Sequence, residues 1–206
     1  RAMCPELQER WPEAARPEQW RGVTMENGRV VKLELEDFGL TGAVPAEICR
    51  LSALKMLDLN NNKLTSVPAE IGQLTSLEIL NLHGNQLTSV PAEIGQLTSL
   101  EWLHLSANDL TSLPAEIGRL TSLEMLDLDH NQLTSVPAEI GQLASLEQLG
   151  LNGNQLTSVP AEIGQLTSLT QLYLNDNKLT SLPAAIRELR AAGCYVQLGV
   201  GVTFDE

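Results

Sequence analysis

Hydrophobic residues recur along most of this 206-residue chain with a constant spacing of 23 positions. The repeated pattern is LxxLxxLxLxxNxLTSVPAEIGQ, in which leucines alternate with variable positions around one asparagine. It begins at six leucines: Leu51, Leu74, Leu97, Leu120, Leu143 and Leu166. A fixed period of this length is typical of repeat architectures, in which each copy forms one coil and stacks on its neighbours. The pattern therefore predicts a solenoid with six regular coils.

The LxL segment of each copy predicts a short strand with one buried face. In Leu80-Asn81-Leu82, alternation along an extended chain places both leucines on one side and the middle residue on the other. The asparagine that follows, Asn85 in this copy, is expected to turn the chain inward. Its amide is expected to bond backbone groups of adjacent coils, which would otherwise be buried without partners.

The Pro-Ala-Glu-Ile-Gly segment predicts a short helical turn on the opposite side of each coil. Proline presets the backbone near the first helical position, glutamate suits the positive end of a helix, and glycine permits the exit. Stacked coils bury apolar side chains that one coil alone would leave exposed. We therefore expect an α/β solenoid, a horseshoe with a parallel concave sheet, short convex helical turns and two caps.

The N-terminal region departs from the regular pattern. An irregular copy spans residues 27–50, is one residue longer through Gly42-Ala43, and has Phe38 where the regular copies have asparagine. An aromatic residue at that position fits an end coil that packs against a cap. We expect the preceding residues to supply this cap, with Trp11 and Trp20 covering the end of the core.

The C-terminal region departs from the pattern as well. Residues 183–194 predict a longer helix, and the alternating apolar residues of segment 195–204 predict a closing strand. The expected organisation has three parts: an N-terminal cap at 1–26, leucine-rich repeats at 27–188 (one irregular, six regular), and a C-terminal cap at 189–206.

The repeated phrase resembles a known family. The 23-residue unit with LPxEIGxLxxL is similar to the Ras-group-related intracellular leucine-rich-repeat proteins of plants and animals. Segments 20–24, 28–31 and 40–45 resemble the N-terminal region of plant receptor-type leucine-rich-repeat proteins, although that family usually has a cysteine where Met25 stands. The resemblance covers nearly the whole chain, and it implies protein–protein recognition on the concave face.

The charge balance narrows the class of partner. The chain has 13 basic and 26 acidic side chains, which gives a net charge of −13. Nucleic acid and anionic membranes are disfavoured, because both require clustered lysine and arginine. A protein or peptide of basic character is the expected partner. No stretch of about 18 apolar residues is present, so no membrane-spanning helix is expected, and we expect a monomer.

Cysteine usage bears on the compartment. Cys4, Cys49 and Cys194 are an odd and sparse set, whereas secreted disulfide frameworks usually contain more cysteines in even number. Reduced thiols and a cytoplasmic location are therefore expected. A Cys4–Cys49 bridge, and with it an extracellular location, stays open as the alternative.

Comparison of the six copies with one another predicts the ligand-binding face. The leucine, LTS and PAEI positions scarcely change, whereas variation collects at strand positions that point away from the core. The expected binding residues are Met56, Asp58, Ile79, Asn81, His83, Trp102, His104, Met125, Asp127, Asp129, His130 and Tyr173. Random sequence drift would also vary the exposed positions on the outer, helical side of the coils. There, however, the Ala-Glu and Gly-Gln pairs stay nearly fixed. A surface selected for contact explains this difference; recent duplication is the competing explanation.

The expected binding face combines apolar and acidic residues. One apolar row consists of Met56, Ile79, Trp102 and Met125, which fall on neighbouring strands spaced about 4.8 Å apart. A row with tryptophan near its centre is typical of a binding hot spot, and simple packing among surface side chains is the alternative. Asp58, Asp127 and Asp129 flank the row. The sequence thus predicts an acidic groove with an apolar spine.

All three histidines fall on the same face. His104 and Asp127 hold the same position in adjacent copies, so their side chains are expected to be neighbours. A metal site built from His83, His104 and Asp129 or His130 is one alternative. We favour ordinary hydrogen-bonding histidines, and no metal or cofactor is predicted.

Three other functions compete with ligand binding. An enzyme is disfavoured because the serines recur by period as scaffold residues, and no P-loop or Cys/His nucleophile pairing is present. An ice-binding function would use the threonine that recurs in every copy, but the curvature of a solenoid spoils a flat lattice match. A passive, consensus-type scaffold without a selected ligand is favoured by the near-identity of the outer phrases.

Overall fold

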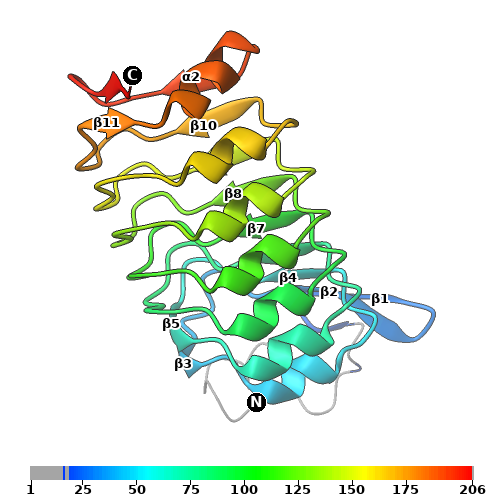
Figure 1. Ribbon diagram of the computed structural model, residues 1–206. Helices are drawn as coiled ribbons and strands as arrows, with labels where there is room; N and C mark the ends of the chain where they lie inside the picture. Colours follow the sequence, from blue (N-terminus) through cyan, green and yellow to red (C-terminus); the bar gives the residue numbers. More distant parts are fainter. Residues whose placement is uncertain (1–15, 17–18, 206) are drawn as a thin grey trace.

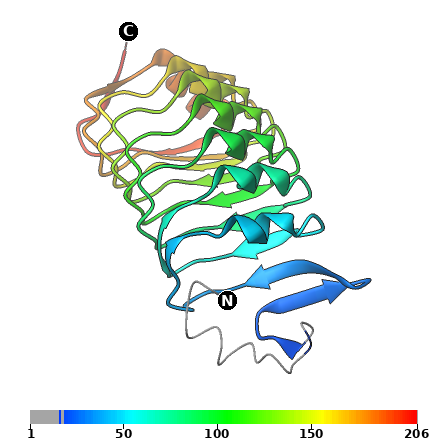
Figure 2. The ribbon, with the colours of Figure 1, turned by 90° about the horizontal axis from the view of Figure 1, so that it is seen from below.

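The computed structural model describes residue 16 and residues 19–205. Its coils stack one on another along the length of the molecule, with short helices aligned on one side and strands on the other (Figure 1). The view along the stack shows the two layers of each coil joined by loops (Figure 2). This arrangement is the predicted solenoid, with a strand layer and a helical layer enclosing an aliphatic core.

The strand layer is a nine-stranded sheet in which spatial order follows chain order. Its strands are β1 (Val23–Glu26), β2 (Arg29–Glu34), β4 (Met56–Asp58), β6 (Ile79–Asn81), β7 (Trp102–His104), β8 (Met125–Asp127), β9 (Gln148–Gly150), β10 (Gln171–Tyr173) and β12 (Tyr195–Gln197). β1 pairs antiparallel with β2, and the later strands are all parallel. Each regular copy therefore contributes one three-residue strand at the same level.

The helical layer consists of short 3₁₀ helices and one α-helix. The 3₁₀ helices are η2 (Ala46–Arg50), η3 (Ala69–Gln73), η4 (Ala92–Gln96), η5 (Ala115–Arg119), η6 (Ala138–Gln142) and η7 (Ala161–Gln165), and the α-helix is α2 (Ala184–Ala191). In η3, the Ile71 N–H donates to Pro68 O at 3.1 Å and the Leu74 N–H to Ile71 O at 3.0 Å. These bonds between residues three apart define a 3₁₀ turn, so the predicted helical turns are confirmed.

The leucines of both layers form one continuous core. Leu80, Leu103 and Leu126, at the centres of adjacent strands, are fully buried, as are the isoleucines of the central 3₁₀ helices. Each coil covers the apolar side chains of the next, which removes them from water along the whole stack. The side chains that flank each central leucine point the other way, onto the exposed face of the sheet.

The recurring asparagine joins adjacent coils. Asn108 Nδ2 donates to the carbonyl oxygens of Leu82 (2.9 Å) and Leu105 (3.0 Å), while its Oδ1 accepts from the Leu87 N–H (3.0 Å). Equivalent bonds are made by Asn62, Asn85, Asn131, Asn154 and Asn177. The predicted role of this residue is confirmed: it satisfies backbone groups that the turn would otherwise leave buried and unpaired.

The irregular first copy differs from the regular copies at the position of the recurring asparagine. Phe38 is buried at the position of the asparagine. β3 (Thr41–Ala43) pairs with β5 (Lys63–Ser66), and the register shifts between Gly42 and Ala43, where Thr65 of β5 has no partner in the pairing. Trp20 is partly buried, whereas Trp11 lies outside the described residues. The division of the chain at 26/27 and 188/189 stays a prediction, and α2 crosses the second boundary.

The C-terminal segment corrects one expectation. Residues 195–204 do not form one closing strand: β12 joins the main sheet, and β13 (Thr203–Phe204) pairs with β11 (Ser181–Leu182) in a separate small sheet. Gly201 has φ +84° in the connection, and Val200 is fully exposed. The segment of alternating apolar residues therefore contains two short strands and a turn between them. The helix expected at 183–194 is confirmed as α2.

Two described cysteines lie in the interior. Cys49 and Cys194 are both buried. Burial, aided by the nearby Glu70 carboxylate, raises the pKa of the Cys49 thiol to about 11, so this thiol stays protonated at neutral pH. Cys4, the suggested disulfide partner of Cys49, lies outside the described residues.

Candidate binding face

Strand pairing brings the predicted site residues into two rows across the main sheet. In the first row, Met56, Ile79, Trp102 and Met125 are successive partners on β4, β6, β7 and β8. In the second row, Asp58, Asn81, His104, Asp127, Gly150 and Tyr173 are successive partners on β4 to β10. We call the surface formed by these rows the concave face.

The first row is an apolar strip with its most exposed member near the centre. Trp102 is 43% exposed, while Ile79 and Met125 on either side are partly buried. Lys32 continues the row at one end and Gln148 at the other. The strip thus spans four strands and ends in polar residues on both sides, which is the pattern of an apolar patch with a polar rim.

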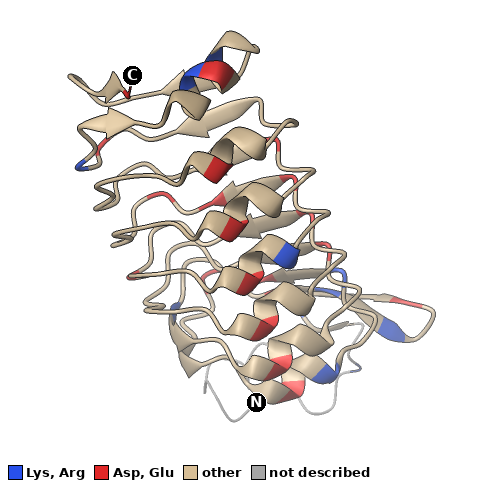
Figure 3. Cartoon of the chain, in the orientation of Figure 1, with Lys and Arg blue, Asp and Glu red and all other residues tan. Residues whose placement is uncertain are grey.

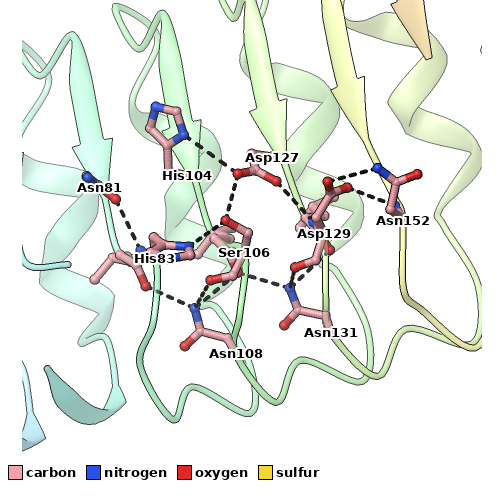
Figure 4. Close-up of polar contacts among 12 residues, drawn as sticks. Asn81, His83, His104, Ser106, Asn108, Asp127, Asp129, Asn131 and Asn152 are labelled. Atoms are coloured by element: carbon pink, nitrogen blue, oxygen red, sulfur yellow. Dashed lines mark hydrogen bonds and ion pairs between the residues drawn. The ribbon is translucent and has the colours of Figure 1, made fainter. Parts of the chain in front are cut away.

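The second row is largely polar, and two pairs of neighbours in it contact each other. Asn81 Nδ2 donates to Asp58 Oδ2 at 3.3 Å. His104 Nδ1 lies 3.9 Å from Asp127 Oδ2, and the two residues are direct partners on β7 and β8 (Figure 4). The expected proximity of His104 and Asp127 is therefore confirmed.

Residues just after the strands add a hydrogen-bonded chain to this row. Ser106 Oγ donates to Asp127 Oδ2 at 2.6 Å, and His83 Nδ1 lies 2.8 Å from the same hydroxyl (Figure 4). Because the serine has one proton and gives it to Asp127, His83 Nδ1 is the donor in the second contact. His83, Ser106 and Asp127 thus form a fixed polar chain across three coils.

The two neighbouring carboxyl groups have pKa shifts of opposite sign. Burial acts to raise the pKa of Asp127, but the nearby His104 imidazole and the hydrogen bonds from Ser106 and the Asp129 N–H outweigh it, so this pKa falls below its ordinary value of 3.8. At Asp129, burial raises the pKa despite two bonds from Asn152, and the charge of Asp127 adds to the rise. Asp127 is therefore the more firmly ionised of the pair.

One of the variable positions has a backbone explanation. His130 has φ +54°, and every equivalent residue of the other regular copies also has positive φ: Asn61, Gly84, Ala107, Gly153 and Asp176. Asparagine, aspartate and glycine tolerate this conformation best. The variation at this position therefore follows in part from the turn that leaves each strand. A binding role for His130 stays a prediction.

A small hollow beside the second row was not predicted from the sequence. It has a volume of about 220 Å³ and is lined by Met125, Asp127, Asp129, Gln148, Gly150, Asn152, Tyr173 and Gln197. Half of these residues belong to the predicted site, and the other half were missed. The available signal was Gly150, which is the residue without a side chain in the second row.

Negative charge is not confined to the concave face. Each 3₁₀ helix carries a glutamate in its first turn: Glu47, Glu70, Glu93, Glu116, Glu139 and Glu162. These form the row of acidic positions on the helical side in Figure 3. Negative charge therefore lies on both sides of the solenoid, and charge alone does not distinguish the predicted binding face from the helical side.

Residues 16 and 19–205 contain neither a cluster of metal ligands nor a membrane-spanning helix. No group of three or more His, Cys, Asp or Glu side chains is arranged to hold a metal ion, and the alternative of a metal between His83, His104 and Asp129 or His130 gains no support. In the same part of the chain, no helix has both the length and the apolar character needed to span a membrane.

Family models match most of the repeat region. Residues 26–134 match the model described as "Leucine-rich repeat region", and residues 144–188 match the one described as "Leucine Rich repeats (2 copies)". No curated protein matches the chain. The first match alone covers more than half of the sequence.

Solved structures with the same fold include a bacterial and two plant proteins. A leucine-rich-repeat protein of Leptospira interrogans is 36% identical (TM-score 0.63), with 84% of this chain and 55% of that one covered. The leucine-rich-repeat ectodomain of the Arabidopsis thaliana receptor kinase GASSHO1/SCHENGEN3 is 32% identical (TM-score 0.84; 96% and 25%). The plant peptide hormone receptor RGFR1 is 30% identical (TM-score 0.73; 87% and 37%). The chain spans about half the length of the first of these proteins, and less of the others.

Proposed function

The chain belongs to the leucine-rich-repeat family, and from this premise we propose that it is a protein-interaction module that binds a protein or peptide on its concave face. The observation that carries the proposal is the exposed strip around Trp102. Trp102 is 43% exposed and stands among apolar neighbours, and an exposed tryptophan within an apolar strip is typical of a binding hot spot.

Rigidity of the strip supports this function. Its four side chains stand on paired strands whose backbone is held by hydrogen bonds to both neighbours. A partner that packs on Trp102 therefore meets a preformed surface and loses little of its binding free energy to ordering of the site. Tryptophan is also among the residues that dominate measured binding energies.

The similar plant structures agree with this class of ligand. The GASSHO1/SCHENGEN3 ectodomain is in complex with CASPARIAN STRIP INTEGRITY FACTOR 2, and RGFR1 is in complex with RGF2. From these structures we infer for this chain only the class of ligand, which is a protein or peptide. The cytoplasmic location and the monomeric state stay predictions, and a receptor-like extracellular setting is the alternative, since one matched structure is an ectodomain.

Catalysis is the less favoured function on chemical grounds. Ser106 is the serine that lies between His83 and Asp127, but it is buried and its proton is directed to the carboxylate. A serine nucleophile needs the opposite arrangement, with the hydroxyl exposed to substrate and hydrogen-bonded to a histidine base. The chain of polar contacts is better explained as a support for the concave face.

Removal of the Trp102 ring tests the proposal. A peptide is first selected from a display library on the intact chain, and its affinity is then measured by calorimetry for each variant. Trp102→Ala should weaken binding by about 2 kcal/mol or more, roughly 30-fold, because a central aromatic contact is lost. The melting temperature should hardly change, since the side chain lies on the surface.

Val200→Ala is the matched control, because Val200 is an exposed apolar residue away from the strip. This variant should bind the peptide as the parent chain does. Equal affinity of the Trp102→Ala variant and the parent would remove Trp102 from the binding site and overturn the proposal.

A further inference from the structure

The hollow on the concave face exists because one strand residue has no side chain. Gly150 on β9 stands between Asp127 on β8 and Tyr173 on β10. A Cβ atom at Gly150 would lie 2.8 Å from Asp129 Oδ1 and 3.2 Å from Asp127 Oδ1. Its absence opens a space of about 220 Å³, into which one oxygen of each carboxylate faces.

Two carboxylates line the hollow, and the nearest basic side chain to Asp127 is the His104 imidazole, with Nδ1 3.9 Å from Asp127 Oδ2. The lining includes two aspartates and neutral residues but neither lysine nor arginine. Asp127 is held ionised by Ser106 and His104, and Asp129 accepts two bonds from neutral Asn152. Each carboxylate has lone pairs beyond these contacts. A cationic group is therefore the ligand chemistry that the hollow favours.

The opposite wall offers an aromatic surface. Tyr173 packs edge to face against Tyr195, with ring centroids 6.1 Å apart, and its hydroxyl donates to Gln171. The ring is thus held from two sides beside the hollow that it lines. Arginine binds carboxylates through several N–H donors at once and stacks its planar group on aromatic rings, which a lysine ammonium does less well.

We propose that this hollow is a subsite for an arginine side chain of the bound protein or peptide. The inference rests on the proposed function and specifies it, because the hollow adjoins the apolar strip through Met125. Its volume is below the roughly 300–1,000 Å³ typical of sites for whole small molecules, and it suits one side chain. Carboxylates that line it repel phosphate and carboxylate groups.

A small probe tests the subsite without knowledge of the natural partner. The tripeptide acetyl-Gly-Arg-Gly-amide is titrated into the intact chain, and the amide resonances of Gly150 and Asn152 are followed by NMR. The arginine peptide should shift them saturably. The citrulline peptide, which keeps the shape but lacks the charge, should bind at least tenfold more weakly, and the lysine peptide should lie between them.

Variants of the chain locate the binding. Gly150→Asn places in β9 the residue that β6 has at the same level, Asn81, and should reduce the affinity for the arginine peptide at least tenfold by filling the hollow. Gly150→Ala is the smaller alternative if the first variant is destabilised. Asp127→Asn should have a similar effect, whereas Glu139→Gln, the same charge change on the helical side of the same coil, should have none.

Equal binding of the arginine and citrulline peptides, or full affinity in a folded Gly150 variant, would overturn the subsite. These results would not by themselves contradict the proposed function. A display-selected peptide that loses affinity with Trp102→Ala but tolerates citrulline in place of every arginine would support the concave face and contradict the hollow. A peptide that keeps its affinity both for the Trp102→Ala variant and after replacement of every arginine by citrulline would contradict the subsite and the proposed function alike.

Discussion

Asp127 and Asp129 illustrate how two like residues acquire different behaviour from their hydrogen bonds. Both are partly buried, which alone raises the pKa of each. Asp127 lies beside the His104 imidazole and accepts hydrogen bonds from a serine and a backbone N–H, so its ionised form is favoured in the folded state. Asp129 receives only the two bonds from Asn152 and stands next to another carboxylate. The sequence places both residues on one face but does not show which donors reach them.

The opposite shifts predict opposite pH trends in stability. A carboxyl group whose pKa is lower in the folded state stabilises the fold above its unfolded pKa, and this contribution is lost as pH falls through the folded pKa. Asp127→Asn should therefore cost about 1–2 kcal/mol of unfolding free energy at pH 7, and the cost should shrink below pH 3.8, the ordinary value of the group. Urea unfolding at several pH values measures this.

Asp129→Asn provides the comparison. A raised folded pKa means that ionisation of the group disfavours folding as pH rises, so this variant should gain stability relative to the parent chain with increasing pH. The unfolding free energies of the two variants should thus move apart as pH rises from acidic to neutral. Parallel pH profiles would show that the hydrogen bonds do not set the ionisation of the pair as described.

Most structural residues of the repeat could be predicted from the sequence, whereas the hollow could not. A buried position such as Leu103 or Asn108 is recognised because the same side chain returns at the same place in each copy. The hollow depends instead on one residue that differs, Gly150, together with the orientation of side chains from neighbouring coils. The positive φ of His130 was missed for a related reason: the mixture of Asn, Gly and Asp at its position reflects the turn, but resembles variation for binding.

At the scale of elements, close stacking of the 3₁₀ helices depends on the glycine in each PAEIG segment. A Cβ at Gly118 in η5 would lie 2.4 Å from the Glu139 carbonyl oxygen of η6, and the same distance recurs between Gly95 and Glu116. Real Cβ atoms do not approach backbone oxygens this closely. The fixed glycine therefore has a packing reason beyond its place in the helical turn.

Gly118→Ala should destabilise the chain by about 1–3 kcal/mol, because adjacent helices must move apart to admit the methyl group. Gly199→Ala is the control: its Cβ would meet only Val202 Cγ2 at 3.8 Å, and the backbone at Gly199 does not have positive φ. Urea unfolding of the two variants should show a loss for the first and little change for the second. A stable Gly118→Ala variant would mean that the helical layer is less tightly packed than described.

At the scale of the molecule, periodicity predicts the regular coils better than the ends. The structure predicted for one regular copy is supported by its neighbours, because in each copy the same three-residue strand and 3₁₀ helix must bury the same leucines. The C-terminal segment has no second copy for comparison. Its alternating apolar residues therefore suggest one strand. In the structure, β12 and β13 belong to two different sheets, and a turn at Val200 and Gly201 connects them.

The whole molecule also shows why net charge is a weak guide to the binding face. Carboxylates lie on both sides of the solenoid: the first-turn glutamates of the helical side, seen in Figure 3, and Asp58 and Asp127 on the strands. Long-range attraction therefore brings a basic partner to either side. The two sides differ in shape and apolar exposure. Among the described residues, the strand side combines a rigid apolar strip with a hollow, and the assignment of the binding face depends on this combination.

Site-specific photo-crosslinking tests this assignment most directly. The photoreactive residue p-benzoylphenylalanine is placed on the concave face in place of His104 and, in a second protein, on the helical side in place of the exposed Gln96 of η4. Each is irradiated with a display-selected peptide at a saturating concentration. The account predicts a crosslinked product from position 104 and none from position 96. A product from position 96 alone would contradict it.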